Sequence, residues 1–177
     1  MESIKFEIKD KNIQLRSFKK SDLEDLVTHA NNTNISKFMT NKFPHPYTKE
    51  DGMQFIKHAT STKGNHKIFA IVIEGEVCGG IGLHPQDDVF QFNAELGYWV
   101  GEKYWGHGIV TEAIKHMVNY GFTNMKIKRI FARPFSNNPG SKRVLEKAGL
   151  NYEATLKATV HKNGEVLDEL IYSIHKF

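Results

Sequence analysis

The sequence lacks the features of an exported or membrane-spanning protein. No window approaches the run of about 18 apolar residues that a bilayer-spanning helix needs. The first twelve residues alternate charged with apolar side chains, without the continuous apolar centre of a signal peptide. The single cysteine, Cys78, cannot form an intrachain disulfide and lies in an apolar run beside no visible activating group. These absences predict a cytoplasmic protein without membrane association, whose cysteine is a small buried side chain.

Concentrated positive charge and metal-ligand spacings are also lacking. The formal net charge is +4, but the lysines are spread along the whole chain. There is no basic block with stacking aromatics and no helix-turn-helix pattern, so we expect no nucleic-acid partner. The nine histidines show no His-Glu-x-x-His or related spacing, so we expect no metal. A polyanionic cofactor remains compatible with the charge, and the oligomeric state is not determined by these features.

Periodicity predicts one mixed α/β domain of the α+β kind over residues 1–177, a length that suits a single domain. Three strands in the middle of the chain should form an antiparallel meander. The expected strands occupy 11–18, 67–73, 77–83, 92–100, 129–135, 151–161 and 165–177. The expected helices occupy 21–32, 34–39, 48–61, 108–125 and 137–150.

Short polar signals mark where several of these elements begin or turn. Ser21, with Glu24 three residues later, is the expected capping box of the first helix, and Thr48 is the expected cap of the third. Asn163-Gly164 separates the last two strands and predicts a tight hairpin turn.

The most informative stretch runs from residue 98 to residue 117, where a strand leads through a glycine-bearing turn directly into a long helix. The first amides of a helix lack intrahelical partners and carry partial positive charge, so a diphosphate can bind there. Gly106 and Gly108 permit close approach and positive φ, and Lys103 would add charge. The sequence has no P-loop, and Thr111 stands where a dinucleotide fingerprint needs its third glycine. Such glycines can also be purely structural.

The stretch YWGHGIVTEA resembles the acetyl-CoA motif of the GNAT superfamily, Arg/Gln-x-x-Gly-x-Gly/Ala, with Lys103 in the Arg/Gln place. Its wording is most similar to the branch that contains ribosomal-protein alanine N-acetyltransferases. Further similarities follow in the order of that branch: IQLRSFKKSDLEDL, FPHPYTKEDGMQFI, AELGYWV, NNPGSKRVLEKAGL and NGEVLDELIYSI. Five matches in order are much more specific than one glycine motif.

The resemblance implies a mostly antiparallel, splayed sheet flanked by helices, with acetyl-CoA wedged between strands 92–100 and 129–135. The expected cofactor-binding residues are Trp99, Val100, Lys103, Tyr104, Trp105, Gly106, His107, Gly108, Ile109, Asn138 and Ser141. Tyr104 and Trp105 could instead pack the turn, and Asn138 could cap a helix. Glu112, on the first turn of its helix, is interpreted as supporting the helix dipole.

Acetyl transfer from a thioester to an amine needs a neutral amine, a stabilised oxyanion and a stabilised leaving thiolate. The resemblance gives Glu95 the place of a carboxylate that deprotonates the amine; the alternative is a salt-bridged strand residue. Leu145 stands where many relatives carry a tyrosine for the departing sulfur, so Ser141 is the expected substitute. Ser141 could also be a first-turn helix serine without a catalytic part.

The sequence therefore predicts an acetyl-CoA-dependent N-acetyltransferase that works by direct attack in a ternary complex. The resemblance favours a protein N-terminal α-amine as acceptor, and small amines and antibiotics remain open. The acceptor cleft should be lined by residues 31–63 and the last hairpin. A CoA-binding sensor or adaptor that lost turnover is the alternative function.

Overall fold

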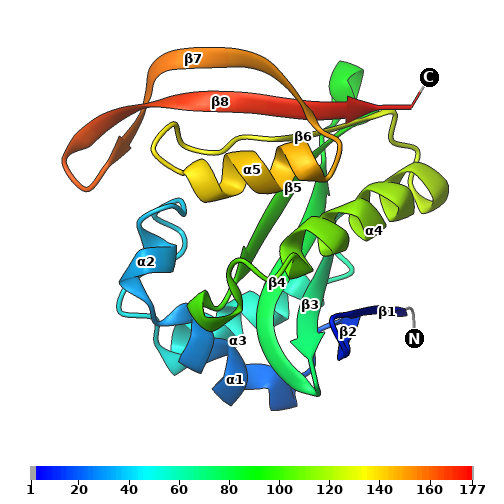
Figure 1. Ribbon diagram of the computed structural model, residues 1–177, viewed down its shortest axis with the longest axis vertical. Helices are drawn as coiled ribbons and strands as arrows, with labels where there is room; N and C mark the ends of the chain where they lie inside the picture. The colour runs from blue at the N-terminus through cyan, green and yellow to red at the C-terminus, as the bar shows by residue number, and fades with distance from the viewer. Residues whose placement is uncertain (1–2, 177) are drawn as a thin grey trace.

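The computed structural model describes residues 3–176 and contains an eight-stranded sheet in the order β1-β2-β3-β4-β5-β6-β8-β7 (Figure 1). The strands are β1 Ser3–Ile8, β2 Lys11–Arg16, β3 Lys67–Ile73, β4 Glu76–Pro85, β5 Asn93–Val100, β6 Arg129–Ala132, β7 Asn151–Lys162 and β8 Glu165–His175. The α-helices are α1 Leu23–Ala30, α2 Thr33–Ser36, α3 Lys49–Ala59, α4 Ile109–Asn124 and α5 Pro139–Lys147. Three 3-10 helices are η1 Lys20–Asp22, η2 Asp88–Phe90 and η3 Glu102–Tyr104.

The sheet is antiparallel throughout except where β5 meets β6. The expected meander is confirmed as β3-β4-β5, and the mixed, mostly antiparallel sheet flanked by helices is confirmed as well. β5 and β6 pair in parallel over three residues, and this ladder ends at Glu95 and Phe131. β5 then continues to Val100, so its last five residues extend past the end of this ladder. The sheet therefore splits beside the second half of β5.

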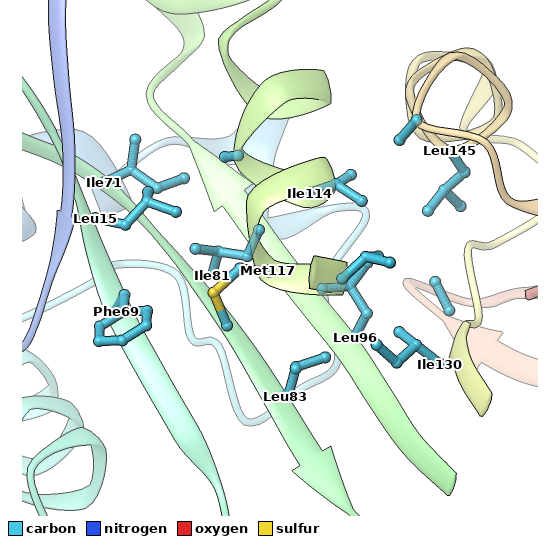
Figure 2. Packing of buried hydrophobic residues seen from close by; sticks show 14 of the residues in the cluster. Leu15, Phe69, Ile71, Ile81, Leu83, Leu96, Ile114, Met117, Ile130 and Leu145 are labelled. Atoms are coloured by element: carbon cyan, nitrogen blue, oxygen red, sulfur yellow. The ribbon is translucent and has the colours of Figure 1, made fainter. Parts of the chain in front are cut away.

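The two faces of the sheet are covered by different helices (Figure 1). On one face, α4 and α5 pack over the strands, and Ile114 and Met117 of α4 lie against Ile81 and Leu96 in the main core (Figure 2). A second core on the other face gathers residues of α1, α2 and α3 around Trp99. This second surface is called the α1–α3 face below. No described helix is long and apolar enough to span a bilayer.

The first strand of the structure, β1, was not predicted. Its exposure alternates along the strand, and it pairs with β2 through a turn at Lys9 and Asp10, whose φ values are 48° and 62°. The alternation of charged and apolar side chains was already visible in the sequence, but it was used only to argue against a signal peptide. β1 lies at the sheet edge, where a strand needs a single apolar face.

Two of the polar signals were predicted correctly. Thr48 caps α3 through a reciprocal capping box with Asp51. Asn163 and Gly164 have φ values of 52° and 82° and form the β7–β8 turn.

The capping box expected at Ser21 was wrong. Helical structure begins one residue earlier, in η1, and the carboxylate of Asp22 accepts the backbone N–H of Lys19 instead. The same carboxylate binds Arg16 through two hydrogen bonds, so a pairing with the preceding strand fixes this helix start.

Candidate functional site

The turn that leads into α4 has the conformation expected of an anion-binding turn. Gly106 and Gly108 have φ values of 76° and 82°, which side chains rarely adopt, and a Cβ on either residue would meet nothing within 4 Å. The glycines are therefore required by backbone conformation, not by packing against neighbours. Gly106 and His107 are exposed, whereas the Ile109 side chain is buried in the core and leaves only its amide at this end of the helix. The turn is an open helix N-terminus that could receive a diphosphate.

Trp105 fixes the turn to the strand before it. Its indole N–H donates to the carbonyl of Val100 at 2.9 Å, while 43% of the residue remains exposed. Trp105 therefore combines local packing with a surface that a ligand in the turn could contact.

The Lys103 ammonium is held behind the turn by Glu76. Its Nζ lies 3.1 Å from both carboxylate oxygens of Glu76, and Tyr104 donates its hydroxyl to the same carboxylate at 2.8 Å. His29 Nε2 is 2.8 Å from the other oxygen of that carboxylate. Hydrogen bonds from His29, then Tyr104 and Lys103, lower the pKa of Glu76 to about 2. Lys103 and Tyr104 thus tie η3 to the start of β4.

The same cluster contains three groups of metal-ligand type. Ligand atoms of His29, Glu76 and Cys78 all lie within 4.8 Å of one another. However, the Glu76 oxygens already accept hydrogen bonds from Lys103 and Tyr104, and burial raises the pKa of the Cys78 thiol to about 11. Cys78 is fully buried, as expected. The cluster is a hydrogen-bond network centred on the Glu76 carboxylate, which already binds the ammonium group of Lys103.

The register of β4 and β5 shows which backbone groups face the split. Gly101 N–H donates to Cys78 C=O, and Gln86 N–H donates to Asn93 C=O, so the odd-numbered residues of β5 bond to β4. In an antiparallel pair the intervening residues point their N–H and C=O groups the other way. The amide groups of Tyr98 and Val100 therefore face the split. The backbone of Trp99 bonds to β4 instead, and its indole packs edge-on against Phe43 on the α1–α3 face.

Ser141 and Tyr98 meet across the split. The Ser141 Oγ lies 2.6 Å from the Tyr98 Oη, and burial raises the pKa of the Tyr98 phenol well above its usual value. The Ser141 N–H donates to the side-chain oxygen of Asn138 at 3.0 Å, so Asn138 does cap α5. Leu145, one turn further on, is fully buried in the core. The Tyr98 side chain was not identified from the sequence.

Glu95 lies where the β5–β6 ladder ends, and its carboxylate forms an ion pair. Arg133 donates to both oxygens, each at 3.0 Å, and also lies 3.3 Å from Glu169 on β8. The Glu95 carboxylate raises the pKa of Arg133 above its usual value. The salt-bridged arrangement expected as the alternative is therefore present, and the role of Glu95 as a base stays a prediction. Neither Arg133 nor Glu169 was identified from the sequence.

The two segments expected to line the acceptor side come together in the structure. Lys162, next to the tip of the β7–β8 hairpin, donates to the Asn41 side chain at 3.0 Å. Phe43 packs against Tyr47 as well as Trp99, so this loop covers the end of β5 on the α1–α3 face. The Glu112 side chain pairs with Lys115 on α4, in keeping with a local role.

Comparison with known sequences supports one family. The model of the acetyltransferase (GNAT) domain matches residues 12–151. The N-acetyltransferase p20 of Bacillus licheniformis, itself uncharacterised, is 27% identical over 167 residues, covering 93% of this chain and 93% of that protein. The ribosomal-protein-serine acetyltransferase of Escherichia coli is 27% identical over 111 residues, which cover 63% of this chain and 62% of the relative.

Solved structures share the fold over nearly the full length. A GNAT-family acetyltransferase from Bacillus anthracis has a TM-score of 0.81 at 26% identity, covering 97% of this chain and 98% of that one. RimL, a ribosomal L7/L12 α-N-protein acetyltransferase in complex with coenzyme A, has a TM-score of 0.84 at 17% identity, with coverages of 97% and 98%. Spermidine N-acetyltransferase from Vibrio cholerae, with CoA and spermine, has a TM-score of 0.76 at 21% identity, with coverages of 92% and 95%.

Proposed function

Because the chain belongs to the GNAT family of acetyltransferases, we propose that it moves the acetyl group of acetyl-CoA to a protein N-terminal α-amine. The observation that carries this proposal is the split of the sheet after Glu95, which ends beside the open turn at Gly106 and Gly108. A thioester held in the split would have β5 backbone on one side and α5 on the other. Transfer proceeds by direct attack in a ternary complex, since the only cysteine is buried with a raised thiol pKa.

The donor site in this proposal is built mainly from backbone. The amides from Trp105 to Ile109 bind the diphosphate, aided by the helix dipole. The amide groups of Tyr98 and Val100 bind the pantetheine as a strand would, although the Val100 carbonyl is already used by Trp105. Lys103 acts by holding η3 in place through Glu76. The Asn138 side chain, besides capping α5, also bonds a pantetheine amide in this proposal.

The reaction joins the acceptor nitrogen to the acetyl carbon and breaks the carbon–sulfur bond, while the nitrogen loses one proton. Backbone N–H near Tyr98 stabilises the oxyanion. The bonding electrons leave with sulfur, and the Ser141 hydroxyl, itself bonded to Tyr98, donates a hydrogen bond to the departing thiolate. The proton leaves on the α1–α3 face of β5, where the Glu95 side chain lies.

The ion pair of Glu95 favours an α-amine over a side-chain amine as acceptor. Both oxygens of the Glu95 carboxylate accept hydrogen bonds from Arg133, so an amine that needs this carboxylate would have to displace one of them. An α-amine has an ordinary pKa of about 7.7–8.0, against about 10.4 for an alkylammonium, so it is partly neutral without help. RimL, named as an α-N-protein acetyltransferase, and spermidine N-acetyltransferase represent these two kinds of acceptor among proteins of similar fold.

An acceptor screen tests the proposal. Peptides that begin with Ala or Ser, the same peptides with blocked α-amines, polyamines and aminoglycosides are offered with acetyl-CoA, and release of CoA is measured. We expect release with free α-amines and its loss on blocking. Turnover confined to polyamines or aminoglycosides would overturn the choice of acceptor. Binding of acetyl-CoA without transfer to any amine would overturn catalysis and support the sensor alternative.

A further inference from the structure

His84 lies beside Glu95 on the α1–α3 face. It sits near the end of β4, and the register places it directly opposite Glu95 on β5. Side chains of directly opposed residues share a face, with Cβ atoms about 4.5–5.5 Å apart. Glu95 and Trp99 alternate onto this face of β5, so His84 lies on the side that the expected acceptor segments cover.

The residues two positions before His84 and two positions after Glu95 on this face are both glycines. Gly82 and Gly97 are paired across β4 and β5. A Cβ on Gly97 would meet His84 Nε2 at 4.0 Å, and one on Gly82 would meet the same atom at 3.3 Å. The imidazole Nε2 therefore reaches over bare backbone at Gly97, one residue before Tyr98, whose amide faces the proposed thioester. Gly97 is exposed, so an acceptor can approach this point.

The charges around His84 favour a neutral imidazole that can take up a proton. Its ring stacks on His66 with centroids 6.1 Å apart, and His66 stacks on His58 at 4.6 Å. Although the side chain is exposed, surrounding protein atoms partly desolvate it, and this effect, then His66 and His58, lowers the pKa of His84; Glu95 opposes them. Lys42 acts on His58 in the same lowering direction, further along the row.

Among the described residues, Glu95 is the carboxylate that raises the pKa of His84. Lys67, on the neighbouring strand β3, directs its ammonium over Phe69 and Tyr120 in the other core. Arg133 binds both oxygens of Glu95. A proton placed on Glu95 would break part of that ion pair, whereas a proton placed on His84 would leave it intact and gain an opposite charge across the strands.

Building on the proposed function, we propose that His84 is a catalytic base whose Nε2 accepts the proton that the acceptor nitrogen loses. The neutral amine attacks the acetyl carbon, the carbon–nitrogen bond forms, and the N–H proton passes to Nε2 while Nδ1 keeps its own. The carbon–sulfur bond breaks and its electron pair leaves with sulfur. Glu95 acts through His84, as a positioning and charge-stabilising residue for the imidazolium. No earlier step of the sequence reasoning had singled out His84.

The test is the pH dependence of His84→Gln, measured as kcat/KM for an accepted amine from pH 5 to 9. General-base catalysis contributes about 100-fold or more, so kcat/KM should fall by at least roughly that factor above neutral pH. The ratio of wild-type to variant kcat/KM should rise about tenfold per pH unit below the pKa of His84 and become constant above it. The dissociation constant of acetyl-CoA should not change, which shows that the variant is folded.

Three further variants make the result decisive. His58→Gln, in the same row but away from Gly97, is the matched control: above the pKa of His84 its kcat/KM should stay near that of the wild type, and because His58 lowers that pKa, its pH profile should move only to slightly higher pH. In Glu95→Gln, kcat/KM should still level off at the pKa of His84. This point should lie at lower pH than in the wild type, because Glu95 raises the pKa of His84. Free imidazole should restore part of the activity of His84→Ala.

The outcomes separate this inference from the function on which it rests. Active wild-type enzyme with an unchanged or pH-independent ratio for His84→Gln would overturn the role of His84 alone. Loss of activity in Glu95→Gln with full activity in His84→Gln would return the base to Glu95. Wild-type protein that acetylates no amine would contradict the proposed function itself, and the role of His84 with it.

Discussion

At the scale of single residues, the hydroxyl pair of Ser141 and Tyr98 is the proposed substitute for the leaving-group tyrosine that the family resemblance would place on α5. The equivalent position, Leu145, is buried in the core and cannot reach the split. Tyr98 brings a phenol from the opposite side, 2.6 Å from the Ser141 Oγ. Burial keeps this phenol protonated by raising its pKa, so the pair can donate one hydrogen bond beyond its own contact.

Removing either hydroxyl should weaken the stabilisation of the thiolate. A hydrogen bond to a charged group contributes about 1.5–3 kcal/mol, so Ser141→Ala should lower kcat roughly 10- to 100-fold. Tyr98→Phe removes the hydroxyl that is bonded to Ser141 but leaves the Ser141 hydroxyl itself. It should lower kcat by about fivefold, which corresponds to about 1 kcal/mol. Steady-state kinetics measure both, with acetyl-CoA affinity as the control. Unchanged kcat in Ser141→Ala would leave Ser141 as a structural residue of the first turn.

Sequence patterns found the residues that local chemistry specifies and missed their partners. Gly106 and Gly108 were identified because a left-handed turn before a helix has a local signature. Arg133 was missed because it meets Glu95 only across 38 positions of sequence. His29 and Glu76 are 47 positions apart, and no pattern joins them. Residues paired through the sheet register become visible only when the strands are aligned.

At the scale of elements, two carboxylates hold η3 in place: its own Glu102, which accepts from the side chains of Asn32 and Asn34, and Glu76 on β4. Glu76 receives hydrogen bonds from Lys103 and Tyr104 of η3 and from His29 of α1. Gly101 starts this segment, and a Cβ there would lie 2.5 Å from His29 Nδ1, so the chain passes very close to α1. These contacts therefore also position the turn at Gly106 and Gly108, which directly follows η3.

Glu76→Gln should therefore weaken acetyl-CoA binding without abolishing it. Partly exposed ion pairs contribute about 0.2–1 kcal/mol, so the dissociation constant should rise by up to about fivefold. Isothermal titration measures this, and Glu24→Gln, which breaks the exposed pair with Lys49, is the matched control. An unchanged affinity would show that η3 is held without the carboxylate.

The effect of Glu76→Gln on stability should depend on pH in the acid range. The pKa of Glu76 is lowered from 4.5 to about 2 in the folded protein, so its stabilising effect is present above pH 4.5 and disappears as the pH falls towards 2. The difference in unfolding free energy between wild type and Glu76→Gln should shrink over that interval in urea titrations.

The element boundaries show where prediction by pattern was sufficient. α4 and the β7–β8 turn were predicted because apolar spacing and Asn163-Gly164 are local properties. The first helix began earlier than expected, because the pairing of Asp22 with Arg16 on β2 decided its start. A helix cap contributes only about 1 kcal/mol to stability, so a long-range ion pair can shift the start of a helix away from the residue that the capping pattern predicts.

At the scale of the whole molecule, the split leaves two parts of the sheet connected by only a short β5–β6 ladder, so a ligand that binds in the split should add to the stability of the fold. The first five strands and the last three are joined within the sheet by the three residue pairs of β5 and β6. The Glu95–Arg133 pair and the contacts between α4 and α5 add to this junction. Arg129 and Glu153 tie β6 to β7 on the far side, where hydrogen bonds led by Arg129 lower the pKa of Glu153 to about 2.

Acetyl-CoA bound in the split should stabilise both halves and protect particular amides. Ligand at 100 times its dissociation constant adds about 2.7 kcal/mol to the unfolding free energy, so Tm should rise with ligand concentration. Hydrogen exchange should slow at Tyr98 and Val100, whose N–H groups face the split, whereas Gly97 and Trp99, already bonded to β4, should change less. Exchange measured residue by residue with and without acetyl-CoA tests this alternation. Equal protection of all four amides, or protection confined to the turn after β5, would show that the pantetheine does not bind along this strand.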